Sequence, residues 1–176
     1  MTAALCARFA LLTLLLCTIA GCGYRFTNSQ PGRLGTAQTI WVPFFSNESV
    51  SSTAQTVLRR AFYDESHALR GLYPAENEAS ADLAMKARIL SYSSGVVSYS
   101  AIDQARELRL YLNVELEIVK KGQTVPLWKG QIQSTKQYQA NNSLELQRNA
   151  EEQALDAAAR IIAQKFYSSL EGSAKP

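Results

Sequence analysis

The chain has 176 residues, 47% of them hydrophobic and 19% charged, with a formal net charge of +3. This length is enough for one domain with a sizeable hydrophobic core. The net positive charge is weak, and Lys and Arg do not form a dense stripe along the chain. We therefore expect no nucleic-acid partner.

The first 21 residues have the layout of a secretory signal peptide. Arg8 is followed by an apolar run from Phe9 to Ile19, and the small residues Ala20 and Gly21 close the segment. A charged start, an apolar middle and small residues at the end are typical of such peptides. The run is too short for a membrane-spanning helix, which needs about 20 apolar residues. We therefore predict a signal peptide at 1–21.

The cysteine that follows makes this segment more specific. The stretch "IAGC", Ile19 to Cys22, resembles the bacterial lipobox, which implies lipid attachment to Cys22 and cleavage just before it. The alternative is a free cysteine beside an ordinary cleavage site. Acyl chains would anchor the protein to a membrane without spanning it. In the bacterial lipoproteins that this stretch resembles, Asp after the cysteine retains the protein at the inner membrane. Gly23 at this position therefore implies the outer membrane, on its periplasmic side. The other cysteines, Cys6 and Cys17, leave with the signal, so we expect no disulfide.

The next segments predict a tether, a strand and a helix. Residues 22–38 are rich in turn-forming residues and are expected to be a lipidated N-terminus and tether. The stretch Thr39 to Phe45 is β-branched and aromatic and predicts a strand, which Pro43 places at an edge or ends early. Helical spacing then indicates one apolar stripe, which consists of Ala54, Val57, Leu58, Ala61 and Phe62. Gly71 and Pro74 stand beyond the end of this helix.

Strict alternation predicts the strands that follow. Between Ala81 and Ser100, one side carries Leu83, Met85, Ala87 and Ile89, and Gly95 suggests a bulge or bend. The clearest strand alternates Leu108, Leu110, Leu112, Val114, Leu116 and Ile118 with Arg109, Tyr111, Asn113, Glu115 and Glu117. After a turn at 120–126, a partner strand places Trp128, Gly130 and Ile132 inward. One apolar and one polar face is the pattern of an antiparallel sheet.

A long helix completes the predicted fold. It runs from about Leu144 to Leu170, with an inner stripe made of Ala154, Leu155, Ala158, Ile161, Ile162 and Phe166. We expect an α+β two-layer sandwich in which two helices pack on one face of a mostly antiparallel four-stranded sheet. The order is β-α-β-β-β-α, in a single domain at 39–170, followed by a flexible tail at 171–176.

The residues give little support for catalysis. The one histidine, His67, lies near the end of the first helix, where a surface or capping role is more common than a general base. Glu115 and Glu117 share the polar face, where a solvated or interface role outweighs paired acid–base work. The sequence contains no motif for a metal or an activated nucleophile. We predict no enzyme, no catalytic residues, no metal and no cofactor.

The residues after the lipobox point to a family. The stretch "GCGYRF", Gly21 to Phe26, resembles the start of the mature LptE lipoproteins, and the order of predicted elements is similar over nearly the whole chain. This resemblance implies a non-enzymatic outer-membrane lipoprotein. It further implies a plug inside the LptD β-barrel, which the protein helps to assemble, and binding of lipopolysaccharide on its way to the cell surface.

Two groups of residues fit these partners. Barrel-facing candidates lie on the polar sheet face, namely Arg109, Tyr111, Asn113, Lys129 and Gln131. The alternative is that this face simply meets water. For lipopolysaccharide phosphates the candidates are Arg106, Lys136 and Arg148, which we expect near one end of the sheet and the start of the last helix. Asp103 and Glu107 depart from a purely basic end.

Two other functions remain open at this point. One is a lipoprotein of another envelope complex, such as an activator of a peptidoglycan synthase, although the short predicted tether keeps the domain near the membrane. The other is an envelope hydrolase, against which the missing catalytic constellation argues.

Overall fold

The computed structural model describes residues 34, 36–47 and 52–172. All of them belong to one of the two units into which the chain divides, Pro31–Pro176. The predicted signal peptide, the lipidation site at Cys22 and most of the predicted tether lie outside the described residues. These three expectations therefore stay predictions.

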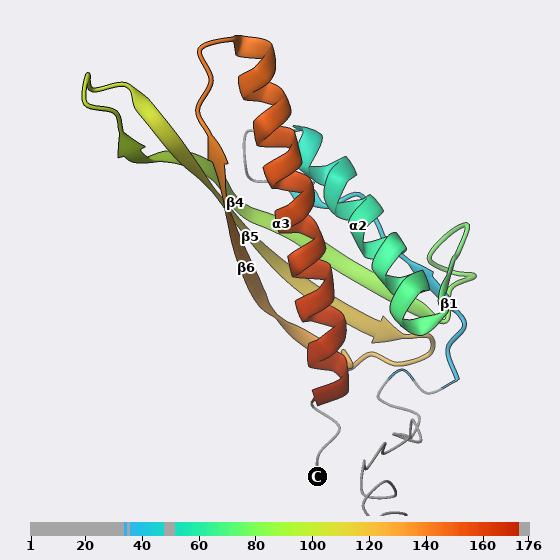
Figure 1. The fold of residues 1–176 in the computed structure, drawn as a ribbon. Helices are drawn as coiled ribbons and strands as arrows, with labels where there is room; N and C mark the ends of the chain where they lie inside the picture. Colours follow the sequence, from blue (N-terminus) through green and yellow to red (C-terminus); the bar gives the residue numbers. More distant parts are fainter. Residues whose placement is uncertain (1–33, 35, 48–51, 173–176) are drawn as a thin grey trace, which may run out of the picture. The chain divides into compact units, whose positions relative to one another are not determined.

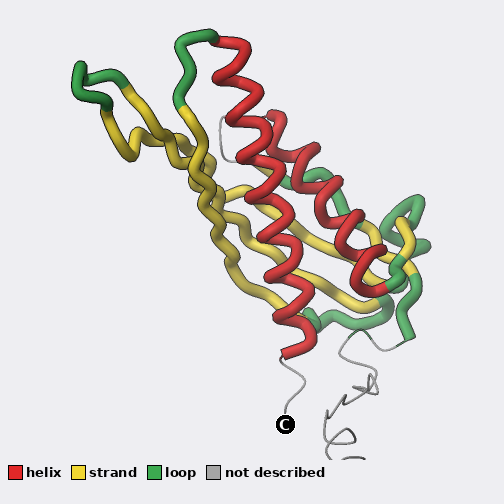
Figure 2. Tube along the Cα trace, viewed as in Figure 1, coloured by secondary structure: helices red, strands yellow, loops and turns green. Residues whose placement is uncertain are grey.

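The elements follow the predicted order, with two short strands added. They are β1 (Thr39–Trp41), β2 (Ser46–Asn47), α2 (Ser52–Arg70), β3 (Tyr73–Pro74), β4 (Leu83–Tyr99), β5 (Ala105–Lys120), β6 (Trp128–Gln139) and α3 (Leu144–Gly172). Both helices lie on the same face of the sheet, as Figures 1 and 2 show. The α+β class and the helix arrangement are thus confirmed.

The sheet itself differs from the prediction. Its strands follow the order β3-β1-β4-β5-β6, with β2 paired to β4, so the described sheet has six strands and not four. Only the β4–β5 and β5–β6 pairs are antiparallel, whereas β1 runs parallel to β3 and β4, and β2 runs parallel to β4. The cause is the helical crossover between β1 and β4, because a crossover returns the chain in its original direction. The sheet is therefore mixed.

Proline determines where the first strand stops. The predicted strand from Thr39 to Phe45 ends at Trp41, before Pro43, and pairing with β4 resumes only in β2. This confirms the early end, but β1 does not form the edge, because β3 lies outside it. Pro74 is tolerated in β3, since an edge strand can lack one outward N–H.

Apolar side chains from both layers form the core. The inward residues of β5 are buried as predicted apart from the half-buried Leu108, and so is the stripe of α3 apart from the half-buried Ile161. Phe166 lies at the centre, with its ring 5.2 Å from Trp128 and 5.5 Å from Phe62. Burial of such side chains contributes about 1.5–3 kcal/mol each. This packing fixes α3 over β6 and β5.

The tip of the β4–β5 hairpin stands apart from the helices. The hairpin is the long pair of strands whose tip stands clear of α2 in Figure 1. Register shifts in β4 leave Leu90 and Val97 without a partner in β5. The predicted irregularity at Gly95 is therefore misplaced, since Gly95 pairs with Arg109. Extra unpaired residues of this kind bend a strand and increase its twist.

Candidate functional site

The face of the sheet opposite the helices carries the first set of predicted site residues. We call it the open face. In β5 it presents Arg109, Tyr111, Asn113, Glu115 and Glu117, each paired across to a polar residue of β6, respectively Gln137, Thr135, Gln133, Gln131 and Lys129. All five barrel-facing candidates therefore lie on one surface. Only polar side chains and Tyr111 line these five rows, so the surface can donate and accept many hydrogen bonds.

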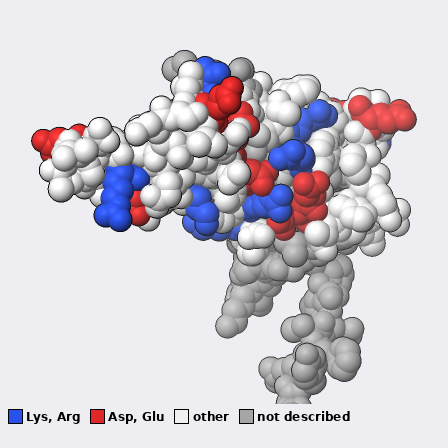
Figure 3. Space-filling view, turned by 45° about the horizontal axis from the view of Figure 1, so that its top comes forward, with Lys and Arg blue, Asp and Glu red and all other residues white. Residues whose placement is uncertain are grey.

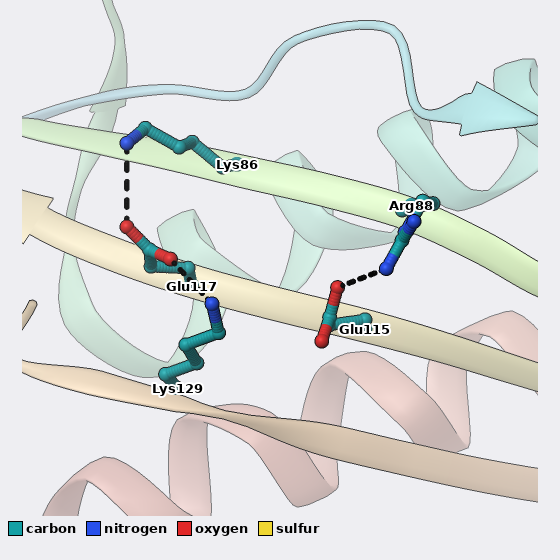
Figure 4. Close-up of polar contacts among 5 residues, drawn as sticks. All are labelled: Lys86, Arg88, Glu115, Glu117 and Lys129. Carbon is teal, nitrogen blue, oxygen red and sulfur yellow. Dashed lines mark hydrogen bonds and ion pairs between the residues drawn. The ribbon is translucent and has the colours of Figure 1, made fainter.

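Ion pairs run across the strands of the open face. Glu117 lies between two lysines, with its Oε1 3.3 Å from the Lys86 Nζ and its Oε2 3.3 Å from the Lys129 Nζ. Arg88 reaches Glu115 Oε2 at 2.8 Å. Figure 4 shows these side chains reaching one another across β4, β5 and β6. Every charged side chain in these two rows thus has an ion-pair partner, with three cations facing two carboxylates.

The pairs affect the ionisation of Glu117. Partial burial acts to raise the pKa of its carboxyl, but hydrogen bonds from Lys86 and Lys129 outweigh burial, so this pKa lies below its ordinary value. The carboxylate is therefore ionised at neutral pH and lacks the raised pKa of a general acid. Glu115 and Glu117 form cross-strand ion pairs, as expected of a solvated or interface face.

Leu90, which has no partner in β5, changes which side chains of β4 face the open side. Before it, the odd-numbered residues of β4 face the helices, for example Ile89, and even-numbered Lys86 and Arg88 face the open side. After it the alternation inverts, so Tyr92 faces the helices and donates a hydrogen bond to Glu151 of α3. The bulge at Leu90 therefore places Lys86 and Arg88 on the open face and Tyr92 on the face that meets α3. Sequence alternation alone missed the roles of Lys86 and Arg88, because the register between β4 and β5 was unknown.

The second set of predicted residues lies at the end of the sheet that holds the tip of the β4–β5 hairpin and the start of α3. We call this region the distal end; it comprises the tip of the β4–β5 hairpin (96–106), the end of β6 with the loop after it (136–143), and the first turns of α3. The Ala140 N–H donates to the Arg106 carbonyl at 3.0 Å, which ties the loop to the start of β5. The expected meeting of these segments at one end of the sheet is thus present in the structure.

The three basic candidates are spread over this end. Arg106 is the second residue of β5, and Lys136 lies opposite Leu110 on the helix side of β6. Arg148 lines a cavity of about 340 Å³ together with Tyr92 and Glu151. Within the described ranges none of the three basic residues has a carboxylate within 4.0 Å, unlike Lys86, Arg88 and Lys129. The structure places them at one end without direct contact between them.

Carboxylates share the distal end with these bases. Asp103 lies in the turn, Glu107 accepts a hydrogen bond from Ser98 at 3.3 Å, and Glu145 lies in the first turn of α3. On the surface drawn in Figure 3, acidic and basic side chains alternate and no large field of one sign is visible. Any anion that binds here must therefore be recognised by individual basic side chains and not by a general positive potential.

Other chemistry finds no geometric support in the described ranges. The exposed ring of His67 stacks edge-on against Tyr73, with ring centres 5.3 Å apart. No group of three or more His, Cys, Asp or Glu residues that could hold a metal is present there. None of the described helices is long and apolar enough to cross a membrane.

Comparison with known proteins assigns the fold to a family. Residues 37–170 match the family model LptE, described as lipopolysaccharide-assembly. No curated protein matches the chain. Among solved structures, rare lipoprotein B from Shewanella oneidensis has a TM-score of 0.52 at 14% identity, covering 77% of this chain and 95% of its own.

A second solved structure agrees with the first. The hypothetical protein CT253 from Chlamydia trachomatis has a TM-score of 0.53 at 9% identity, covering 76% of this chain and 95% of its own. At such identities the structures support the fold alone, but the family match spans most of the chain. The protein therefore belongs to the LptE family of lipopolysaccharide-assembly proteins.

Proposed function

We propose that this protein is an outer-membrane lipoprotein that fills the lumen of an LptD-type β-barrel, helps that barrel to assemble, and binds lipopolysaccharide during export. The observation that carries the barrel contact is the open face. A lumen wall is lined with polar side chains. A plug must therefore offer hydrogen-bonding groups, which the rows from Arg109 to Glu117 provide. This role requires no catalysis by the chain.

The ion pairs of the open face suit such a contact. Lys86 and Lys129 keep 66% and 57% of their side chains exposed while they bind Glu117. Paired charges can approach a polar wall at a lower desolvation cost than isolated ones. The remaining positions, such as Asn113 and Gln131, can both donate and accept hydrogen bonds. The rows that contain Glu115 and Glu117 could thus be enclosed by protein without leaving an unpaired charge.

The experiment that tests the barrel contact is co-purification from detergent-solubilised outer membrane. The full chain should recover a large β-barrel protein. Gln131→Glu with Gln133→Glu adds two charges to the open face and should lower that recovery. The matched control, Asn149→Asp with Gln153→Glu, adds two charges to exposed positions of α3 and should not.

Each result has one meaning. If the wild-type chain recovers no barrel, the plug proposal fails. Equal recovery with both double variants would remove the open face as the contact. Recovery of a peptidoglycan synthase would instead support the alternative function, and hydrolytic turnover by the full chain would support an enzyme.

Lipopolysaccharide binding is proposed for the distal end. Guanidinium groups bind phosphate through two parallel hydrogen bonds, and unpaired arginines keep these donors available. The double variant Arg106→Glu with Arg148→Glu should leave folding intact and weaken lipopolysaccharide binding, more so at low salt. Unchanged binding by the well-folded variant would eliminate these two arginines. Lys136→Glu tests the third candidate in the same way.

Membrane attachment is proposed through Cys22. A diacylglycerol on the sulfur and an acyl chain on the amino group together anchor firmly, since each buried CH₂ contributes about 0.8 kcal/mol. Cys22→Ala should abolish incorporation of a labelled fatty acid and processing of the precursor. Persistent label on that variant would contradict the lipoprotein assignment.

A further inference from the structure

Exposed apolar side chains gather at the distal end. The described residues include ten large hydrophobic side chains that are exposed, and six of these lie there: Val96, Val97, Tyr99, Ile102, Leu144 and Leu146. Tyr99 is 63% exposed and Ile102 is 75% exposed. Single exposed apolar residues are ordinary, but a gathering at one end indicates a binding surface.

An ordered turn presents these side chains. The Ser100 N–H donates to the Gln104 carbonyl at 2.7 Å, and the Asp103 N–H donates to the Ser100 carbonyl at 3.1 Å. Asp103 adopts the left-handed conformation with φ 55°, which completes the turn. Ile102 is held outward between these bonds. In Figure 2 the tip of the hairpin stands apart from both helices, so neither helix covers the turn.

The chemistry of the neighbouring residues indicates an amphipathic anionic ligand. Arg106 follows the turn by two residues, and neither it nor Lys136 has a carboxylate partner within the described ranges. Apolar surface beside unpaired bases is complementary to acyl chains joined to an anionic headgroup. Asp103 would repel such a headgroup at the turn itself. The headgroup would therefore lie toward Arg106 and the acyl chains toward Ile102.

The position along β4 argues against the anchoring membrane as the occupant. β1, which the chain enters from its N-terminal side, pairs with Leu83 and Ala84 at the start of β4. Tyr99 ends the same 17-residue strand. At about 3.3 Å per residue the two ends of β4 lie on the order of 50 Å apart. The distal end is thus the part of this unit remote from the point where the tether enters.

We infer that the distal end binds the acyl chains of lipopolysaccharide through Tyr99 and Ile102, while Arg106 contacts its phosphates. This inference rests on the proposed function, and it adds a recognised chemical group that the proposed function does not name. It makes binding depend on acylation as well as on charge.

The test compares two double variants of the lipidated full chain held in amphipol. Tyr99→Ser with Ile102→Ser alters the distal end. Tyr73→Ser with Val125→Ser is the matched control, because Tyr73 is 60% and Val125 is 73% exposed, away from the distal end. Purified lipopolysaccharide and chemically deacylated lipopolysaccharide, which retains its phosphates, are the two probes.

We expect the distal variant to bind lipopolysaccharide about tenfold more weakly and to bind the deacylated probe as the wild type does. The control variant should match the wild type with both probes. Wild-type affinity of the distal variant for lipopolysaccharide, or an equal loss in the control, would overturn the inference. If the wild type binds neither probe, the proposed lipopolysaccharide binding itself fails.

A second measurement covers the remaining outcomes. A photo-crosslinking residue at Ile102 should form an adduct with lipopolysaccharide in cells, whereas one at Val125 should not. An adduct with phospholipid or protein alone at Ile102 would overturn the inference. So would equal retention of wild type and distal variant on lipopolysaccharide vesicles, together with loss of the variant from phosphatidylethanolamine–phosphatidylglycerol vesicles.

Discussion

Along β5, Leu112 is 1% exposed and its neighbour Tyr111 is 42% exposed, so adjacent residues belong to opposite faces of the same sheet. The covered face meets α2 and α3 through apolar side chains. The open face carries ion pairs such as Lys86–Glu117 and Arg88–Glu115. Partly exposed ion pairs contribute about 0–1 kcal/mol each, far less than burial of the opposite face. Stability therefore resides on one face, and the other can be specialised for a partner.

The largest expected effect comes from a charge placed on the covered face. Leu112→Asp would bury a carboxylate with no partner, which is among the most destabilising of substitutions, above about 4 kcal/mol. Tyr111→Asp, one residue away, should change the free energy of unfolding by less than about 1 kcal/mol. Urea denaturation of both full-chain variants measures the difference. A normal transition for Leu112→Asp would mean that the two faces are assigned the wrong way round.

The faces were predictable because alternation in β5 is unbroken. Apolar residues recur at every second position from Leu108 to Ile118, and burial against two amphipathic helices leaves only one way to orient them. The two short strands were not predictable. β2 and β3 have two residues each, too few for any periodic pattern, and their parallel pairing depends on how the α2 crossover packs.

The candidate site was predictable only in part, for a related reason. The open-face residues of β5 and β6 follow from alternation, so their common surface could be foreseen. Lys86 and Arg88 could not be paired with Glu117 and Glu115, because pairing depends on register and on the bulge at Leu90. The unpaired state of Arg106, Lys136 and Arg148 is likewise a property of three-dimensional distances, which sequence spacing does not contain.

A larger side chain in β6 should destabilise the protein on the covered face and have little effect on the open face. In β6, Gly130 lies on the covered side, where a Cβ atom would come within 3.0 Å of the Trp128 ring that packs on Phe166. Gly130→Val should therefore displace this ring and cost about 2 kcal/mol. Gln131→Val, on the open face, should stay within about 0.5 kcal/mol of the wild type. Thermal melts measure both, and equal losses would contradict the packing around Trp128.

A single hydroxyl sharpens the comparison further. Tyr92 donates a hydrogen bond to Glu151. Burial is the main cause that raises the pKa of the phenol above its ordinary value, and the hydrogen bond raises it further. Tyr92→Phe should cost about 1 kcal/mol. Because folding raises this pKa, the hydrogen bond stabilises the fold fully below the ordinary tyrosine pKa. That stabilisation is lost as the pH rises through the folded-state pKa. Ser93→Ala, on the open face, is the control and should have no measurable effect. An unaltered unfolding free energy for Tyr92→Phe would dismiss this link between the hairpin and α3.

The smallest expected change in the free energy of unfolding comes from removing an ion pair of the open face. Glu117→Gln removes both lysine pairs, but Lys86 and Lys129 are more than half exposed, so solvent screening limits the loss to under about 1 kcal/mol at neutral pH. The pKa of Glu117 is lowered by folding, so its contribution is full above the ordinary value of 4.5 and disappears as pH falls through the folded-state value. Unfolding free energies measured from pH 7 to pH 3 should therefore converge for the wild type and the variant in acid. A difference that persists or grows below pH 4 would show that Glu117 acts through packing and not through its charge, and the open face would then contribute to the fold in the same manner as the covered one.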